Sequence, residues 1–121
     1  MIGLVLTGLV ALGWLGIGVG ALAAPRAASR QYGIVIDDVR SLAFIRAMGV
    51  RDLVIGVLVL LLASTGRQGL LALGMAASAA IALLDFAVVS GDRAARPNAR
   101  LVHGGGAIAL LVAALVIATG R

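Results

Sequence analysis

Four ionisable side chains interrupt otherwise apolar stretches of this sequence: Arg51, Asp52, Asp85 and His103. Charged residues at membrane depth are costly to place, and they usually mark a functional site. Two carboxylates in different environments can divide into a base and an acid, and a histidine can relay a proton at neutral pH. An arginine can stabilise an anion or orient a carbonyl group. These residue types therefore predict proton-transfer chemistry inside a membrane.

The composition supports that setting. Of the 121 residues, 62% are apolar, and the mean hydropathy is +1.15, whereas soluble domains are roughly 45–50% apolar. The sequence predicts an integral membrane protein in a lipid bilayer. All basic residues are arginine and all acidic ones aspartate in a chain rich in alanine and glycine, which is typical of a GC-rich bacterial genome. Most arginines lie beside apolar spans, where they set membrane orientation, so we expect no nucleic-acid partner.

Metal and cofactor motifs are missing from the sequence. It has no cysteine and one histidine, so neither a disulfide nor a thiolate metal site can form. The triple glycine Gly104-Gly105-Gly106 lacks the lysine and the preceding strand of a phosphate loop. We expect neither a metal nor a cofactor.

Four stretches are long and apolar enough to cross a bilayer core, which takes roughly 20 helical residues. They cover about residues 2–24, 42–64, 69–90 and 101–120. The predicted fold is all-α: one four-span transmembrane domain over residues 1–121, with antiparallel up-down spans in a four-helix bundle joined by short loops.

The longest connection, Pro25 to Ser41, follows the first span. We expect it to lie at the membrane interface, as a solvated linker or as a lid over a pocket. Asp37 or Asp38 can cap the next helix by accepting backbone N–H groups. In the first span, Gly13, Gly16 and Gly20 share one face; we interpret this face as packing against a neighbouring span, with homo-oligomer formation as the alternative.

Arginines are unevenly divided between the two sides of the membrane. The loops after the first and third spans hold Arg26, Arg30, Arg40, Arg93, Arg96 and Arg100, and the other side holds Arg67 and Arg121. The positive-inside rule predicts that both termini lie outside an inner or plasma membrane.

This topology places the ionisable groups of three spans at one depth in the cytoplasmic half. Helical phase places Asp52, Asp85 and His103 each on a face of small residues, which suits a helix interface or a cavity wall. Arg51 lies about 100° round the helix from Asp52, and we expect it to pair with Asp52 or Asp85. Residues predicted to contact a substrate are Arg46, Trp14, Tyr32 and Ser78; Arg46 can alternatively snorkel to the headgroups.

Several of these features resemble a known family. They are Pro25 with Ala27-Ala28 after the first span, Gly49-Val50-Arg51-Asp52 opening the second, Asp85 closing the third and His103-Gly104 opening the fourth. Together they resemble a domain of unknown function found in bacterial and fungal four-span membrane proteins, and they are similar in layout to DoxX-like small membrane proteins. The resemblance implies the fold and no settled activity.

The leading hypothesis is a membrane-embedded isomerase, cyclase or hydrolase that acts on a lipophilic small molecule entering from the bilayer. Asp52, Asp85, His103 and Arg51 would be its catalytic residues. One alternative is a small proton-coupled transporter. The other is a structural or accessory subunit whose ion pairs only fix helix register, because buried charges are expected to pair whether or not they do chemistry.

Overall fold

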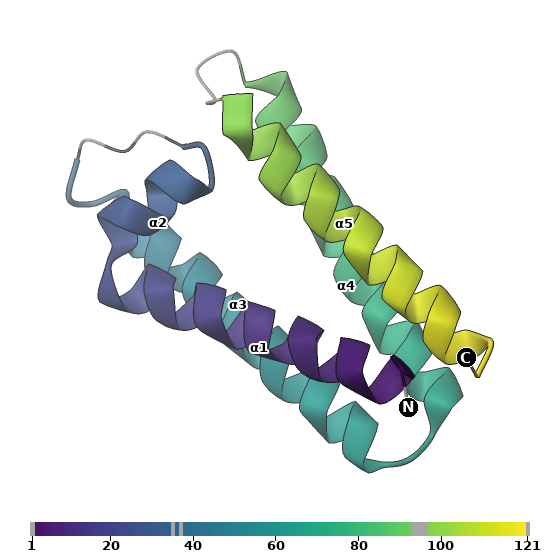
Figure 1. Ribbon diagram of the computed structural model, residues 1–121. Helices are drawn as coiled ribbons and strands as arrows, with labels where there is room; N and C mark the ends of the chain where they lie inside the picture. Colours follow the sequence, from purple (N-terminus) through teal and green to yellow (C-terminus); the bar gives the residue numbers. More distant parts are fainter. Residues whose placement is uncertain (1, 35, 37, 93–96, 121) are drawn as a thin grey trace.

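The computed structural model describes residues 2–34, 36, 38–92 and 97–120 (Figure 1). It contains five helices: α1 (Ile2–Ala23), α2 (Pro25–Gln31), α3 (Leu42–Ser64), α4 (Gln68–Gly91) and α5 (Pro97–Ala118). Helices α1, α3, α4 and α5 are each long and apolar enough to cross a membrane. The all-α prediction with four membrane spans is therefore confirmed, and the chain is a multi-pass membrane protein.

Proline and glycine set several helix boundaries. Pro25 and Pro97 each occupy the first position of a helix, where the missing backbone N–H has no partner to lose. Helix α5 therefore begins at Pro97 and not near residue 101 as predicted. Gly66 has φ of 67° in the turn between α3 and α4, a conformation that glycine adopts without steric cost.

The long helices form two arms. Helix α1 packs along α3, and α4 packs along α5. Figure 1 shows the arms meeting where the two termini and the α3–α4 turn lie, and diverging toward α2. We call the first region the closed end and the second the open end. Between the arms the core combines small side chains, such as the fully buried Ala11, Ala79 and Ala107, with larger ones such as Val59 and Met75.

The close contact in the first arm depends on Gly18 and Gly49. A Cβ atom on Gly18 would lie 2.7 Å from the Gly49 carbonyl oxygen, and one on Gly49 would lie 2.9 Å from the Gly18 carbonyl oxygen. The two backbones can touch because neither residue has a side chain. The prediction that the face of Gly13, Gly16 and Gly20 packs on a neighbouring span is wrong, since a Cβ on any of these three would contact nothing within 4 Å.

The connection after α1 contains a helix that the sequence analysis did not predict. Helix α2 buries Pro25, Ala28 and Ser29 and exposes Arg26 and Arg30. It contacts α1, α3 and α5. This short amphipathic helix therefore covers the open end and is packed against both arms.

The segment between α2 and α3 ends in a turn that a side chain closes. Asp38 Oδ1 accepts a hydrogen bond of 2.8 Å from the backbone N–H of Ser41, the N-cap residue of α3. The prediction that Asp38 caps the first turn of α3 is wrong, because the N–H groups of Leu42, Ala43 and Phe44 bond to backbone carbonyl oxygens, and Asp37 lies outside the described residues.

Candidate functional site

Arg51 joins the two arms through two carboxylates. On its own helix, α3, its Nε and one terminal nitrogen lie 3.1 and 3.0 Å from Asp52 Oδ1. Toward α4, its two terminal nitrogens lie 3.4 and 3.1 Å from the two oxygens of Asp85. Positions 51 and 52 are rotated by about 100° round the helix. The arginine side chain is long enough to bend back and reach the carboxylate of Asp52, so this rotation does not keep the two charges apart. The expected pairing of Arg51 is confirmed with both partners.

Asp52 is almost completely enclosed, with 1% of its surface exposed. Its second oxygen, Oδ2, accepts a hydrogen bond of 2.9 Å from the Tyr32 hydroxyl. Both oxygens of this carboxylate therefore accept hydrogen bonds, which is what a buried anion requires. Asp52 fixes the positions of Arg51 and Tyr32 at the same time.

Tyr32 follows α2 and reaches between the arms. Burial raises the pKa of its phenol above the ordinary value, and the nearby charge of Asp52 and the hydrogen bond to it act in the same direction. The hydroxyl is therefore a neutral donor at physiological pH. Its ring stacks with that of His103, with centroids 6.1 Å apart and planes 25° apart.

His103 supports Tyr32 from α5. Its Nε2 lies 3.2 Å from the Tyr32 carbonyl oxygen. A carbonyl oxygen can only accept a hydrogen bond, so Nε2 carries the hydrogen of this contact. Tyr32 is therefore held by a residue of each arm, Asp52 on α3 and His103 on α5.

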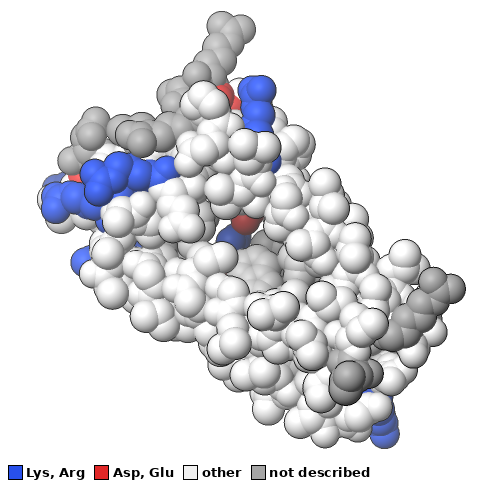
Figure 2. All heavy atoms as spheres, viewed as in Figure 1, with Lys and Arg blue, Asp and Glu red and all other residues white. Residues whose placement is uncertain are grey.

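These polar groups lie in a cavity of about 400 Å³ between the arms. Figure 2 shows it as a hollow with acidic and basic atoms inside. It is lined by Leu6, Leu9, Val10, Gly13, Trp14, Ile17, Tyr32, Arg51, Asp52, Ala82, Asp85, Val102, His103, Gly106, Ala109, Leu110 and Ala113. The exposed side chains Leu9 and Ile17 on α1 and Val102 on α5 border it. The cavity thus opens between α1 and α5, on the apolar surface of two membrane spans.

The residues predicted to contact a substrate fall into two groups. Trp14 and Tyr32 line the cavity. Arg46 is exposed on α3, and Ser78 is buried on α4, where its hydroxyl donates a hydrogen bond of 2.9 Å to the Gly74 carbonyl oxygen. Neither Arg46 nor Ser78 borders the cavity. The sequence analysis gave no sign of the bond between Tyr32 and Asp52, although Pro25 followed by arginines four residues apart is a signal for the short helix that positions Tyr32.

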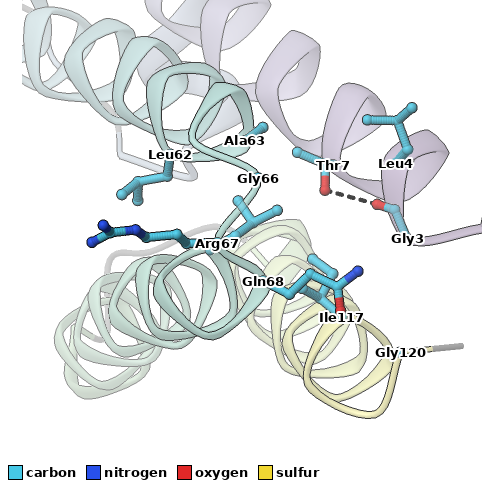
Figure 3. A pocket seen from close by; sticks show the side chains of 11 residues that line it. Gly3, Leu4, Thr7, Leu62, Ala63, Gly66, Arg67, Gln68, Ile117 and Gly120 are labelled. Carbon is cyan, nitrogen blue, oxygen red and sulfur yellow. Dashed lines mark hydrogen bonds between the residues drawn. The ribbon is translucent and has the colours of Figure 1, made fainter.

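A second cavity, of about 240 Å³, lies at the closed end (Figure 3). Arg67 and Gln68 border it on one side and Thr7 on another, and the Thr7 hydroxyl donates a hydrogen bond of 2.7 Å to the Gly3 carbonyl oxygen of its own helix. No carboxylate lines this cavity. Two of the described carboxylates, Asp52 and Asp85, and the histidine line the larger cavity instead.

The larger cavity is not built for a metal ion. Within the described ranges, no three His, Cys, Asp or Glu side chains gather in a group that could hold one. The cationic Arg51 already lies between the two carboxylates. The arrangement can instead bind an apolar molecule, donate hydrogen bonds from Arg51 and Tyr32, and accept a proton on a carboxylate.

Comparisons with known proteins give one match. Neither the curated proteins nor the solved structures yield a match to this chain, so the layout similarity to DoxX-like proteins is not confirmed. The model of one protein family matches residues 11–117, which include every charged residue of the cavity. The chain therefore belongs to the family described as a domain of unknown function, DUF4267.

Proposed function

We propose that this protein is a membrane-embedded enzyme that performs acid/base chemistry, such as isomerisation, cyclisation or epoxide opening, on a lipophilic small molecule. The observation that carries the proposal is the placement of Arg51, Asp52 and Asp85 in a cavity whose other lining is mostly apolar. Convergent polar groups in an apolar pocket are the usual form of a small-molecule site.

The two carboxylates have different roles in this proposal. Asp52 is enclosed, and both of its oxygens are engaged by Arg51 and Tyr32, so it orients these two donors. The Asp85 side chain is 23% exposed, and its bonds to Arg51 measure 3.1 and 3.4 Å. Asp85 is therefore the carboxylate that a substrate can reach, and it is the base.

For an isomerisation, the proton balance is simple. Asp85 accepts a proton from a carbon that lies between a carbonyl group and a carbon–carbon double bond of the substrate, and the electron pair moves through the conjugated system onto the carbonyl oxygen. N–H groups of Arg51 stabilise the negative charge that develops on this oxygen. Asp85 then returns the proton to a different carbon, so the double bond moves and no oxidant or reductant is consumed. His103 holds Tyr32 from α5, and a histidine at this place can relay a proton.

The surroundings of the site support a bilayer-soluble substrate. The cavity opens between α1 and α5, whose outer faces are apolar. We place the open end in the cytoplasm and both termini outside an inner or plasma membrane, because the exposed Arg26, Arg30, Arg40 and Arg100 belong to the open end. The uncovered face of Gly16 and Gly20 on α1 supports a homo-oligomer through this helix.

Hydrogen–deuterium exchange tests the proposal without requiring that the product be identified. Purified protein in lipid nanodiscs is incubated in D₂O with a panel of lipophilic ketones, and deuterium on the carbon next to the carbonyl is measured by mass spectrometry. We expect wild type to accelerate exchange of at least one ketone, and Asp85→Asn to lose about 100-fold or more of that rate.

Arg67→Gln, at the closed end, is the matched control and should exchange at the wild-type rate. The proposal fails if wild type accelerates exchange of no ketone in the panel, or if folded Asp85→Asn protein is as active as wild type.

A further inference from the structure

Two glycines of the larger cavity have no packing role. A Cβ on Gly13 of α1 or on Gly106 of α5 would have no atom within 4 Å, apart from its own chain neighbours and helix backbone. Gly18, Gly49 and Gly56 differ, because a Cβ on any of them would lie under 3.0 Å from an atom of the opposite helix. The space in front of Gly13 and Gly106 is therefore open.

Glycine in the middle of a helix needs a reason, because it is less favourable there than alanine. Close packing supplies that reason for Gly18 and Gly49, whereas Gly13 and Gly106 have open surroundings, as Gly8, Gly16, Gly20 and Gly105 also do. What sets Gly13 and Gly106 apart is the cavity: each lines it, one from each of the helices between which it opens. Any side chain at either position would project into space that a ligand could use.

We propose that Gly13 and Gly106 set the width of a lateral opening between α1 and α5, and thereby the largest ring system that the cavity admits from the bilayer. This inference rests on the proposed function and names its substrate class: a neutral lipophile with a rigid ring system and one oxygen function. The ring system lies between the two glycines, and the oxygen points toward Arg51.

The neutral class follows from the charges in the cavity. Arg51 already forms ion pairs with both Asp52 and Asp85. A fatty-acid carboxylate would therefore enter a low-dielectric space that offers it no unpaired cation among the described lining residues. A ketone or an epoxide brings no charge and accepts an N–H or O–H donor.

Trp14 provides the probe, because it is the single tryptophan of the chain and lines the cavity. A ladder of neutral cyclic ketones, with one, two and four fused rings, is titrated into nanodisc protein while Trp14 emission is recorded. Ligand-induced thermal stabilisation is a second readout, needed because Gly13 adjoins Trp14. The variants are Gly13→Leu and Gly106→Leu, with Gly8→Leu and Gly105→Leu as matched controls. A Cβ at either control position also contacts nothing within 4 Å, and neither glycine borders the cavity.

We expect Gly13→Leu and Gly106→Leu to weaken binding of the widest ketone that wild type accepts by about tenfold or more, and to bind the one-ring ketone nearly as wild type does. Both control variants should bind each ketone of the series as wild type does. Equal binding of the widest ketone by all variants would overturn the inference, as would equal losses in the controls or no binding of any ketone by wild type.

Failure of the opening and failure of the chemistry can be told apart. Ketone binding by the glycine variants reports on the opening, and deuterium exchange by wild type, measured separately, reports on the chemistry. If Gly13→Leu and Gly106→Leu weaken binding of the widest ketone as expected while no ketone exchanges deuterium, the inference about the opening is supported and the proposed chemistry is wrong.

Discussion

The two ends of the molecule place similar residues in different surroundings. At the closed end the arms converge, and Arg67 lies exposed beside a cavity of about 240 Å³ without an ion-pair partner among the described residues. Toward the open end the arms diverge around a cavity of about 400 Å³, and Arg51 is paired with two carboxylates there. Arg67 is therefore a solvated residue at the end of a turn, whereas Arg51 links the two arms.

The difference shows what divergence of the arms allows. Where the arms converge, apolar side chains such as Leu71 and Ile117 pack between them, and no ion pair among the described residues links the arms there. Where they diverge, Arg51 and Tyr32 span the gap, and their polar atoms border a space that a ligand can share. The paired charges, the hydrogen bond between Tyr32 and Asp52 and the larger cavity thus occur together toward one end, and our proposal places the chemistry there.

Replacement of the two arginines should give the largest contrast in stability. Arg51→Met leaves two carboxylates without their cation, and removal of one partner of a largely buried ion pair costs about 3 kcal/mol or more. Arg67→Met alters an exposed side chain and should change the free energy of unfolding by less than about 0.5 kcal/mol. Denaturant unfolding in mild detergent, followed by circular dichroism, measures both.

The combined variant Arg51→Met, Asp52→Asn, Asp85→Asn is the control for this contrast, because it also removes the uncompensated charge and should recover part of the loss. Equal stability of the Arg51 and Arg67 variants would show that the two ends do not differ in the way described.

Two hydroxyl groups give the next contrast. Tyr32→Phe removes the donor to the buried Asp52 and should cost about 1–3 kcal/mol, since an acceptor loses its partner. Thr7→Val removes a hydroxyl that bonds only to a carbonyl of its own helix, and it should cost about 0.5 kcal/mol or less. Thermal unfolding of both variants in the same detergent measures the difference.

The cost of Tyr32→Phe also has a pH dependence. Because the folded-state pKa of Tyr32 is raised, its contribution is fully present below the unfolded value of about 10 and is lost as the pH rises toward the folded value. We therefore expect a constant cost from about pH 6 to about pH 9 and a smaller one above. A cost that already falls between pH 6 and pH 9 would contradict a neutral, buried phenol.

Much of the fold could be predicted because hydropathy is a local property. Four long apolar runs give four helices, and the charges that interrupt two of these runs give the depth of Arg51, Asp52 and Asp85. The glycine contacts could not be predicted in this way. Gly16 and Gly18 look alike in the sequence, and only the crossing of α1 with α3 decides that Gly18 meets Gly49.

The same limit applies to the site. The sequence indicates that Asp52, Asp85 and His103 share one depth, because each is counted along its own helix. It does not indicate that Tyr32 bonds to Asp52, twenty residues further along, because that contact depends on the path of the chain after α2. Ser78 shows the opposite error: it shares a helix face with Asp85, yet its hydroxyl turns back to its own helix.

The smallest contrast concerns the turns that lead into α3 and α4. At the open end Asp38 accepts the Ser41 N–H, and at the closed end Thr65 Oγ1 accepts the Arg67 N–H at 3.2 Å. Hydrogen bonds from the Ser41 side chain, and then from its backbone N–H, lower the pKa of Asp38. Its contribution is therefore present above the ordinary carboxyl value of about 3.9 and is lost as the pH falls through the lowered folded value.

Asp38→Ala and Thr65→Ala should each lower the melting temperature slightly at neutral pH, because both acceptors are exposed. In thermal unfolding at a series of pH values, the Asp38→Ala difference should shrink below about pH 4, where the wild-type carboxyl group takes up a proton in the unfolded chain. The Thr65→Ala difference should stay the same, because a threonine hydroxyl does not titrate. Parallel pH profiles for the two variants would mean that the charge of Asp38 adds nothing to its turn, and that the turns at the two ends are equivalent.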